Sequence, residues 1–309
     1  MRKSRYINEF VSETHAKSQS NKLLRNKNFL SLREKQYTYI MNATSKNPDS
    51  TAKKKYLISK GIDGFFEDLY ELYTFIVRFF KEAFSAPFEW KEIINQCYAV
   101  GYKTLLLVSV TGFITGTVFT KQSRPSLSAF GASSWLPSLV SIAIIKTMAP
   151  LITALIAAGK VGSNIGAELG SMKVTEQIDA MEVSATNPFK FLVASRILAT
   201  TFMMPVLVLY TGLVGMMGAY LNVHANELTS FTSFFISAFK TIEFKDLFTS
   251  LFKAICYGFT IGVAGCYQGY NAQNGTQGVG RAANLAVVYS MFLIFVEELL
   301  IVQVLNSIK

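Results

Sequence analysis

Five long apolar stretches with few charges fill most of the chain after residue 100. Each is close to the roughly 20 residues that a helix needs to cross the hydrocarbon core of a bilayer. The predicted spans cover residues 102–120, 136–158, 192–220, 250–270 and 283–306. A large soluble all-α protein with buried helices is the alternative, but several such runs seldom occur together in one soluble fold. The pattern therefore predicts an all-α integral membrane protein.

An amphipathic segment precedes the first span. Between residues 62 and 84, apolar residues recur at steps of three and four, while Glu67, Glu71 and Arg78 occupy the other face. This periodicity predicts an N-terminal helix that lies in the membrane interface with its aromatic side chains towards the lipid. A helix half-buried against a soluble domain would show the same pattern, and the five spans that follow favour the interface.

Positive charge is concentrated at the start of the chain. Residues 1–60 contain 14 Lys and Arg against four Asp and Glu, so the whole net charge of +10 lies there. Because this segment has no sustained apolar periodicity, we expect a basic, disordered arm before a membrane domain at residues 61–309. Such an arm could bind nucleic acid or anionic lipid. A cytoplasmic arm beside an acidic membrane surface is favoured, and no nucleic-acid partner is expected.

Basic residues near the span ends favour a cytoplasmic N-terminus and an external C-terminus. In this orientation the segment 159–190 faces the cytoplasm and the segment 221–249 faces outwards. Besides the arm, the inner side receives Arg78, Lys81, Lys91, Lys103, Lys160, Lys173, Lys190, Arg196 and Arg281. The outer side receives Lys121, Arg124, Lys240, Lys245, Lys253 and Lys309.

Glycines at intervals of four indicate helix faces that permit close packing. One pair lies in the first span, and a series of three follows the second span. These predicted packing positions are Gly112, Gly116, Gly162, Gly166 and Gly170.

The polar stretch 159–187 connects the second and third spans. If residues 164–182 form one helix, Glu168, Asp179 and Glu182 share a stripe beside the apolar residues Ile165 and Leu169. An exposed ridge of this kind at the tip of a membrane hairpin would fit a groove in a soluble partner. A solvated loop without contacts is the alternative, and the pattern alone does not separate the two.

No catalytic, metal or nucleotide motif is found in the sequence. Gly159-Lys160 is followed by Val161, whereas a phosphate-binding loop requires GxxxxGK followed by Ser or Thr. We therefore expect neither a catalytic residue nor a metal or cofactor in this chain. A pump of this kind would take its energy from a partner.

Three ionisable residues fall within the predicted spans. Lys146 lies in the second span, and Glu297 and Glu298 lie in the fifth. Charges at such depth are costly unless they face protein, water or each other. We expect an ion pair between Lys146 and Glu297. The alternative is a polar lining for a lipid headgroup pathway.

The 159–187 stretch resembles the signature of MlaE-type permeases, the membrane subunits of phospholipid ABC transporters. The matching residues are Ala158-Gly159-Lys160-Val161-Gly162, Ala167-Glu168-Leu169-Gly170, Met172-Lys173, Thr175-Glu176-Gln177-Ile178 and Asn187-Pro188. Two departures occur. The family's Arg-Glu-Leu-Gly-Pro is Lys146-Thr147-Met148-Ala149-Pro150 here, and its Gly-Val-Asp-Pro is Ser184-Ala185-Thr186-Asn187-Pro188.

The resemblance implies a phospholipid permease in a bacterial inner membrane, with a cytoplasmic coupling helix between spans 2 and 3. The residues implied for ATPase coupling are Glu168, Lys173, Glu176 and Asp179. The implied partners are an MlaF-like ABC ATPase that binds ATP and Mg²⁺, an MlaD-like MCE-domain lipid-binding protein, a second copy of the chain, and phospholipid.

Two other functions compete with this one. An autonomous secondary transporter or channel would have inverted repeats around a charged midplane site, and no convincing internal repeat is found. A membrane scaffold without transport activity is the third possibility. A stable complex with an ATPase would separate the first function from both others.

Overall fold

The computed structural model describes residues 50–85, 89–227, 229–273 and 275–307, and these residues form helices joined by short turns, without a β-strand among them. The chain divides into two compact units, Met1–Tyr70 and Glu71–Lys309. The second unit contains all five candidate membrane spans, so the prediction of an all-α protein with five spans is confirmed. Residues 1–49 of the predicted basic arm lie outside the described residues.

Helix α2 (Ser50–Ala83) extends further towards the N-terminus than the predicted helix 62–84. Within the second unit its buried face consists of Phe75, Phe79 and Ala83, one every four residues. The ring of Phe75 packs edge-to-face against Phe189 and Tyr267, with centroid distances of 5.0 and 5.5 Å. This half of α2 is therefore part of the membrane unit's core, and its location in the interface stays a prediction.

The five candidate spans run from Trp90 to Ala129, Ser133 to Val174, Phe189 to Asn226, Phe244 to Tyr270 and Gly275 to Leu305. The first is the single helix α3 (Trp90–Ala129). At 1.5 Å per residue its 40 residues are about 60 Å long, twice the hydrocarbon thickness, so the helix is longer than a span requires. The predicted span 102–120 is its apolar centre.

The second span is built from short helices that follow one another without a loop. They are η1 (Ser133–Trp135), α4 (Leu136–Ala143), η2 (Ile144–Met148), α5 (Ala149–Ala157), η3 (Ala158–Gly162) and α6 (Ser163–Val174). Both η2 and η3 are π-helical, and η2 contains Lys146 and precedes Pro150. Proline lacks the N–H that an unbroken α-helix requires, which accounts for the irregular turn before it.

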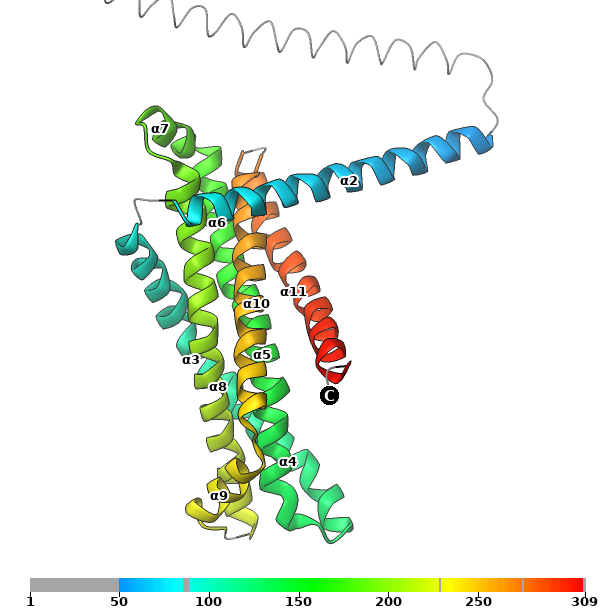
Figure 1. Cartoon of the computed structure of the whole chain (residues 1–309), viewed down its shortest axis with the longest axis vertical. Helices are drawn as coiled ribbons and strands as arrows, with labels where there is room; N and C mark the ends of the chain where they lie inside the picture. The colour runs from blue at the N-terminus through cyan, green and yellow to red at the C-terminus, as the bar shows by residue number, and fades with distance from the viewer. Residues whose placement is uncertain (1–49, 86–88, 228, 274, 308–309) are drawn as a thin grey trace, which may run out of the picture. The chain divides into compact units, whose positions relative to one another are not determined.

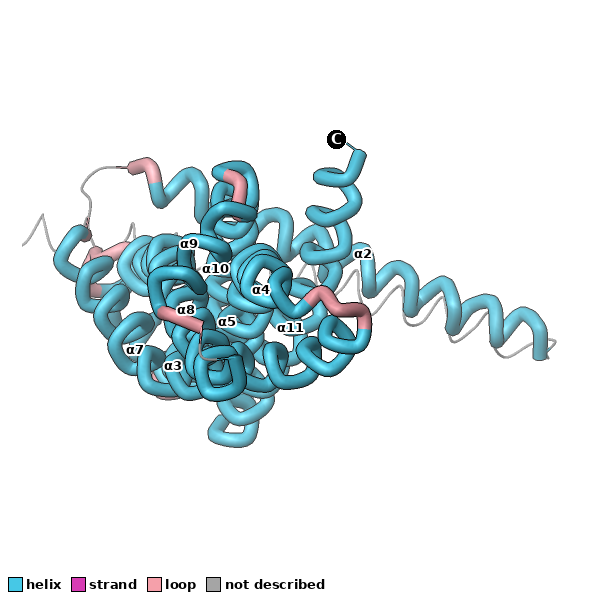
Figure 2. Tube along the Cα trace, turned by 90° about the horizontal axis from the view of Figure 1, so that it is seen from below, coloured by secondary structure: helices cyan, strands magenta, loops and turns pink. Residues whose placement is uncertain are grey.

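The remaining elements complete the bundle. They are α7 (Gln177–Val183), η4 (Phe189–Ala194), α8 (Ser195–Glu227), α9 (Phe231–Thr241), α10 (Phe244–Tyr270) and α11 (Gly275–Ser307). Helices α6 and α7 form the tip at one end of the bundle, and α4 and α9 lie together at the opposite end (Figure 1). The view along the bundle shows α5, α8 and α10 side by side (Figure 2).

Small residues allow the helices to approach closely. A Cβ added to Gly116 of α3 would lie 1.9 Å from the carbonyl oxygen of Gly215 in α8, which leaves no room for a side chain. Gly112 lies against Thr211 of the same helix. On α6, a Cβ at Gly166 would lie 3.1 Å from Ala286 of α11, and Gly162 and Gly170 also face neighbouring helices.

Candidate functional site

The tip of the hairpin contains two helices rather than one. Helix α6 ends at Val174, Glu176 adopts a left-handed conformation with φ of 59°, and α7 begins at Gln177. A left-handed residue ends an α-helix because it turns the chain out of the helical path. The prediction of one helix over 164–182 is therefore wrong, and the proposed stripe of Glu168, Asp179 and Glu182 does not form on a single helix.

The prediction that Ile165 and Leu169 form the apolar part of a docking ridge is also wrong. Ile165 and Leu169 are buried, and they pack beside Gly265 and Gly269 of α10. They hold α6 in the bundle and do not form an outer surface of this chain. On α7, Ile178 is fully buried and serves as the anchor of this short helix.

The outer surface of the tip is formed by α7 and the turn before it. Glu176, Asp179 and Glu182 are exposed, and Val183 is 89% exposed at the end of the helix. Lys173 of α6 pairs with Asp179 across the break, with Nζ 2.9 Å from Oδ1. This pair and buried Ile178 fix α7 against α6, so the tip presents exposed carboxylates together with the exposed apolar side chain of Val183.

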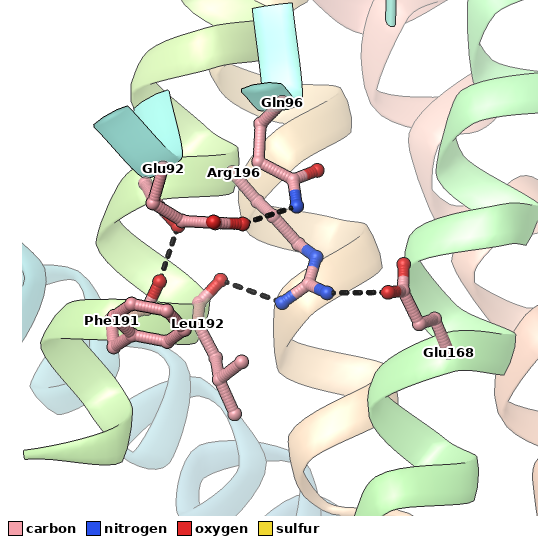
Figure 3. Close-up of polar contacts among 7 residues, drawn as sticks. Glu92, Gln96, Glu168, Phe191, Leu192 and Arg196 are labelled. Carbon is pink, nitrogen blue, oxygen red and sulfur yellow. Dashed lines mark hydrogen bonds and ion pairs between the residues drawn. The ribbon is translucent and has the colours of Figure 1, made fainter. Parts of the chain in front are cut away.

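Arg196 connects the hairpin to the third span. Its side chain is 3% exposed, and its guanidinium lies 2.9 Å from Glu168 Oε1 (Figure 3). It also donates to the carbonyl oxygen of Leu192 at 3.0 Å. Its Nε has no hydrogen-bond partner among the described residues. Glu168, predicted as a coupling residue, is thus the counter-ion of a buried arginine near the start of α8.

The importance of Arg196 was missed from the sequence, where it counted only as one of the inner basic residues. The signal was present, because Arg196 lies inside the predicted span 192–220. An arginine within an apolar run requires a partner, and the nearby acidic hairpin could supply one.

The base of the hairpin is tied to the end of α2. Asn187 donates to Glu82 at 3.0 Å, and Lys190 donates to the carbonyl oxygen of Ser85 at 2.5 Å. The guanidinium of Arg78 lies 4.3 Å from the centre of the Phe189 ring, a cation–π contact. The segment after the tip is thereby fixed to α2 through polar and aromatic contacts.

A second polar cluster lies between α10 and α11. Lys253 is almost fully buried, and its Nζ lies 2.6 Å from Glu298 Oε1. Tyr257 also donates to Glu298, and Thr260 donates to Glu297. Glu297 Oε2 is buried and has no hydrogen-bond partner among the described residues. The sequence placed Lys253 at the outer side, although it falls within the predicted span 250–270.

The predicted ion pair between Lys146 and Glu297 is wrong. Lys146 Nζ lies 2.7 Å from Asp246 Oδ1. Helix α10 begins at Phe244, six residues before the predicted span, and this extra length brings Asp246 beside η2.

Across the described residues, no group of three or more His, Cys, Asp or Glu could hold a metal ion.

Known proteins similar to this chain are permeases or proteins related to them. Residues 93–304 match the family model described as permease MlaE. A probable ABC transporter permease protein of Rickettsia typhi is 36% identical over 241 residues, which cover 78% of this chain and 92% of that protein. A probable ABC transporter permease protein of Synechocystis is 32% identical over 208 residues, covering 67% and 79%. The chloroplastic protein TRIGALACTOSYLDIACYLGLYCEROL 1 of Arabidopsis thaliana is 29% identical over 209 residues, covering 68% and 60%.

Proposed function

Because the chain belongs to the MlaE permease family, we propose that it moves phospholipids between the inner and outer membranes of a bacterium, driven by a separate ABC ATPase. It is a multi-pass membrane permease. The ATPase, rather than this chain, would bind ATP and Mg²⁺. An MCE-domain protein would receive or deliver lipid on the outer side, and the N-terminus would lie in the cytoplasm.

The observation that carries the proposal is the exposed acidic surface of α7. Glu176, Asp179, Glu182 and Val183 are all exposed, on or directly before a short helix that is anchored by Ile178. An apolar side chain within a charged rim is a common feature of docking surfaces for soluble partners. Since the sequence has no nucleotide-binding motif, a partner at this surface would supply the energy.

Helix packing gives the tip a route to the spans. Helix α6 packs on both α10 and α11, with Gly166 against Ala286. The Glu168–Arg196 pair connects the same helix to α8. A displacement of α7 by the ATPase would therefore shift α6 against three spans at once.

Helix α11 supports the proposed second copy and the lipid substrate. Only 17% of its most apolar stretch is buried within the chain, compared with 56% for α10. Its exposed residues include Phe292, Phe295 and Leu299. In a homodimer built on this helix, the two apolar faces would enclose space for acyl chains. The Arabidopsis relative is also named after a lipid, trigalactosyldiacylglycerol.

The test reverses charge on the tip. Glu176→Lys combined with Glu182→Lys should abolish co-purification of the ATPase and ATP-dependent transfer of a fluorescent phospholipid. Neither carboxylate has an ion-pair partner among the described residues, so folding should be preserved. The control, Gln273→Lys with Gln277→Lys, adds positive charge on exposed residues near the α10–α11 turn and should retain both activities.

Unchanged ATPase binding in the tip variant would show that the exposed surface of α7 is not where the ATPase docks. Lipid transfer by the chain without any ATPase would instead favour the secondary transporter.

A further inference from the structure

A cavity of about 770 Å³ opens between the ends of α3 and α8. It lies near the C-terminal end of α3, and it is separate from the polar clusters described above. Its polar lining consists of Lys121, Arg124, Ser128, Ser133, Asn222 and Asn226.

The lining is suited to an anion. Among the described residues, the lining contains two basic side chains and no carboxylate. Within the described part of the chain, Lys121 is not part of any ion pair. Two hydroxyls and two amides surround these cations. Phosphate oxygens accept several charge-assisted hydrogen bonds at once, and arginine and lysine are the side chains most suited to them.

The side-chain oxygen of Asn222, Oδ1, is buried and also has no hydrogen-bond partner among the described residues. The oxygen and nitrogen of an amide can be exchanged by rotation, so this side chain can offer a donor or an acceptor to a bound group. Asn226 donates to the carbonyl oxygen of Asn222 at 2.7 Å, so its side chain is held against the same turn of α8.

The cavity continues an apolar helix face. Val110, Ile114 and Val118 are exposed on α3 at intervals of four, and Lys121 and Arg124 follow on the same side of the helix. From Val110 to Lys121 the helix rises about 16 Å, roughly half the thickness of the hydrocarbon core. An acyl chain lying on this face would therefore bring its headgroup to the level of the cavity.

We propose that this cavity binds the phosphate of a phospholipid headgroup from the leaflet on that side of the membrane. The assignment rests on the proposed function, since it names a place where the transported lipid class enters or leaves. An acidic peptide would satisfy the same cations, but it would gain nothing from the apolar face that leads to them. Free phosphate shares the anion chemistry and likewise makes no use of that face.

The test uses the full-length chain, solubilised in mild detergent, with a photoreactive phenylalanine derivative in place of Ser128. Radiolabelled phosphatidylglycerol should crosslink at this position, and a diacylglycerol with the same acyl chains should crosslink weakly. In the Lys121→Gln, Arg124→Gln variant the phosphatidylglycerol adduct should fall about tenfold, because two charge-assisted contacts are lost. The control, Lys240→Gln with Lys245→Gln, removes two exposed cations that do not line the cavity and should leave the adduct unchanged.

Equal crosslinking of both lipids, or an unchanged adduct in the Lys121→Gln, Arg124→Gln variant with a normal thermal unfolding midpoint, would overturn the site. If the double variant does not unfold cooperatively, Asn226→Ala is tested with the same lipids. The phosphatidylglycerol adduct should then fall several-fold, and an unchanged adduct would overturn the site. If inorganic phosphate fully prevents crosslinking of phosphatidylglycerol, the cavity binds free phosphate instead. If the photoreactive residue crosslinks to a protein in cells, the cavity binds a protein partner instead. The assay contains no ATPase, so a chain that binds lipid here but transfers none with its ATPase would refute the proposed function and leave the site standing.

Discussion

Lys253 shows how a charge is accommodated inside an apolar span. Its side chain is 2% exposed, Glu298 is 14% exposed, and Tyr257 adds a hydrogen bond to the same carboxylate. Removing one partner of a buried pair leaves the other charge uncompensated, whereas removing both also removes the cost of taking the charges out of water. This asymmetry can be measured.

Lys253→Met alone should lower the free energy of unfolding by about 3 kcal/mol, because Glu298 would stay buried without its cation. Adding Glu298→Gln should recover a large part of that loss. Thermal unfolding of the four proteins in detergent gives the coupling energy. Lys173→Met, which breaks the more exposed pair with Asp179, is the control and should cost no more than about 1 kcal/mol. Losses that simply add would show that Lys253 and Glu298 do not stabilise one another.

At this scale the sequence identified charged residues but not all of their partners. It placed Lys146, Glu297 and Glu298 within spans, yet Lys146 contacts Asp246, and Glu298 contacts Lys253. Partner choice depends on where each helix begins and how it is rotated, and apolar runs fix neither. The composition of a span predicts that a charge needs a partner, and only the packed helices show which one.

At the scale of elements, α3 and α8 meet through backbone. Gly116 faces the carbonyl oxygen of Gly215, and a Cβ on Gly218 would lie 2.4 Å from the carbonyl oxygen of Phe113. Close contact of this kind gives the dispersion energy that holds helices together in lipid, where the hydrophobic effect contributes little. A side chain at the contact would therefore have to separate the two helices.

Gly116→Ala should lower the free energy of unfolding by about 2 kcal/mol or more, since backbone rather than a flexible side chain occupies the site. Gly280→Ala is the matched control in α11. No atom lies within 4 Å of its added Cβ, and alanine favours a helix by up to about 1 kcal/mol, so it should be neutral or stabilising. Thermal unfolding in detergent compares the two. A Gly116→Ala protein as stable as the unmodified chain would mean that α3 and α8 do not meet as closely as described.

Elements differed in how well the sequence predicted them. The five spans followed from apolar runs because length and low charge suffice to define them. The break at Glu176 did not, because a glutamate in the left-handed conformation carries no local signal such as a glycine. The burial of Ile165 and Leu169 was also missed, because a short apolar stripe fits a bundle contact as well as a docking ridge. The two π-helical turns in the second span had only Pro150 as a cue.

At the scale of the whole membrane unit, the two ends of the bundle differ in character. Near the end with α6 and α7, Lys160 donates to the carbonyl oxygen of Lys103, and Lys190 donates to the carbonyl oxygen of Ser85. These contacts involve Lys103, Lys160 and Lys190, three of the basic residues that the sequence assigned to the inner side. The opposite end carries α9 and its aromatic cluster, including Phe231 and Phe235 with ring centroids 4.5 Å apart.

This arrangement predicts the orientation of the chain in its membrane. Basic residues favour the cytoplasmic side, so the α6–α7 tip should face the cytoplasm and the start of α9 should face outwards. Ser184 and Ser230 are exposed at these two ends and suit single-cysteine labelling in a chain whose Cys97, Cys256 and Cys266 are replaced by alanine. In intact spheroplasts a membrane-impermeant maleimide should modify Ser230→Cys and leave Ser184→Cys unmodified, and permeabilised cells should show both modified. The reverse pattern would place the α7 surface outside the cell, away from any cytoplasmic ATPase, and would put the cavity at Lys121 and Arg124 beside the inner leaflet.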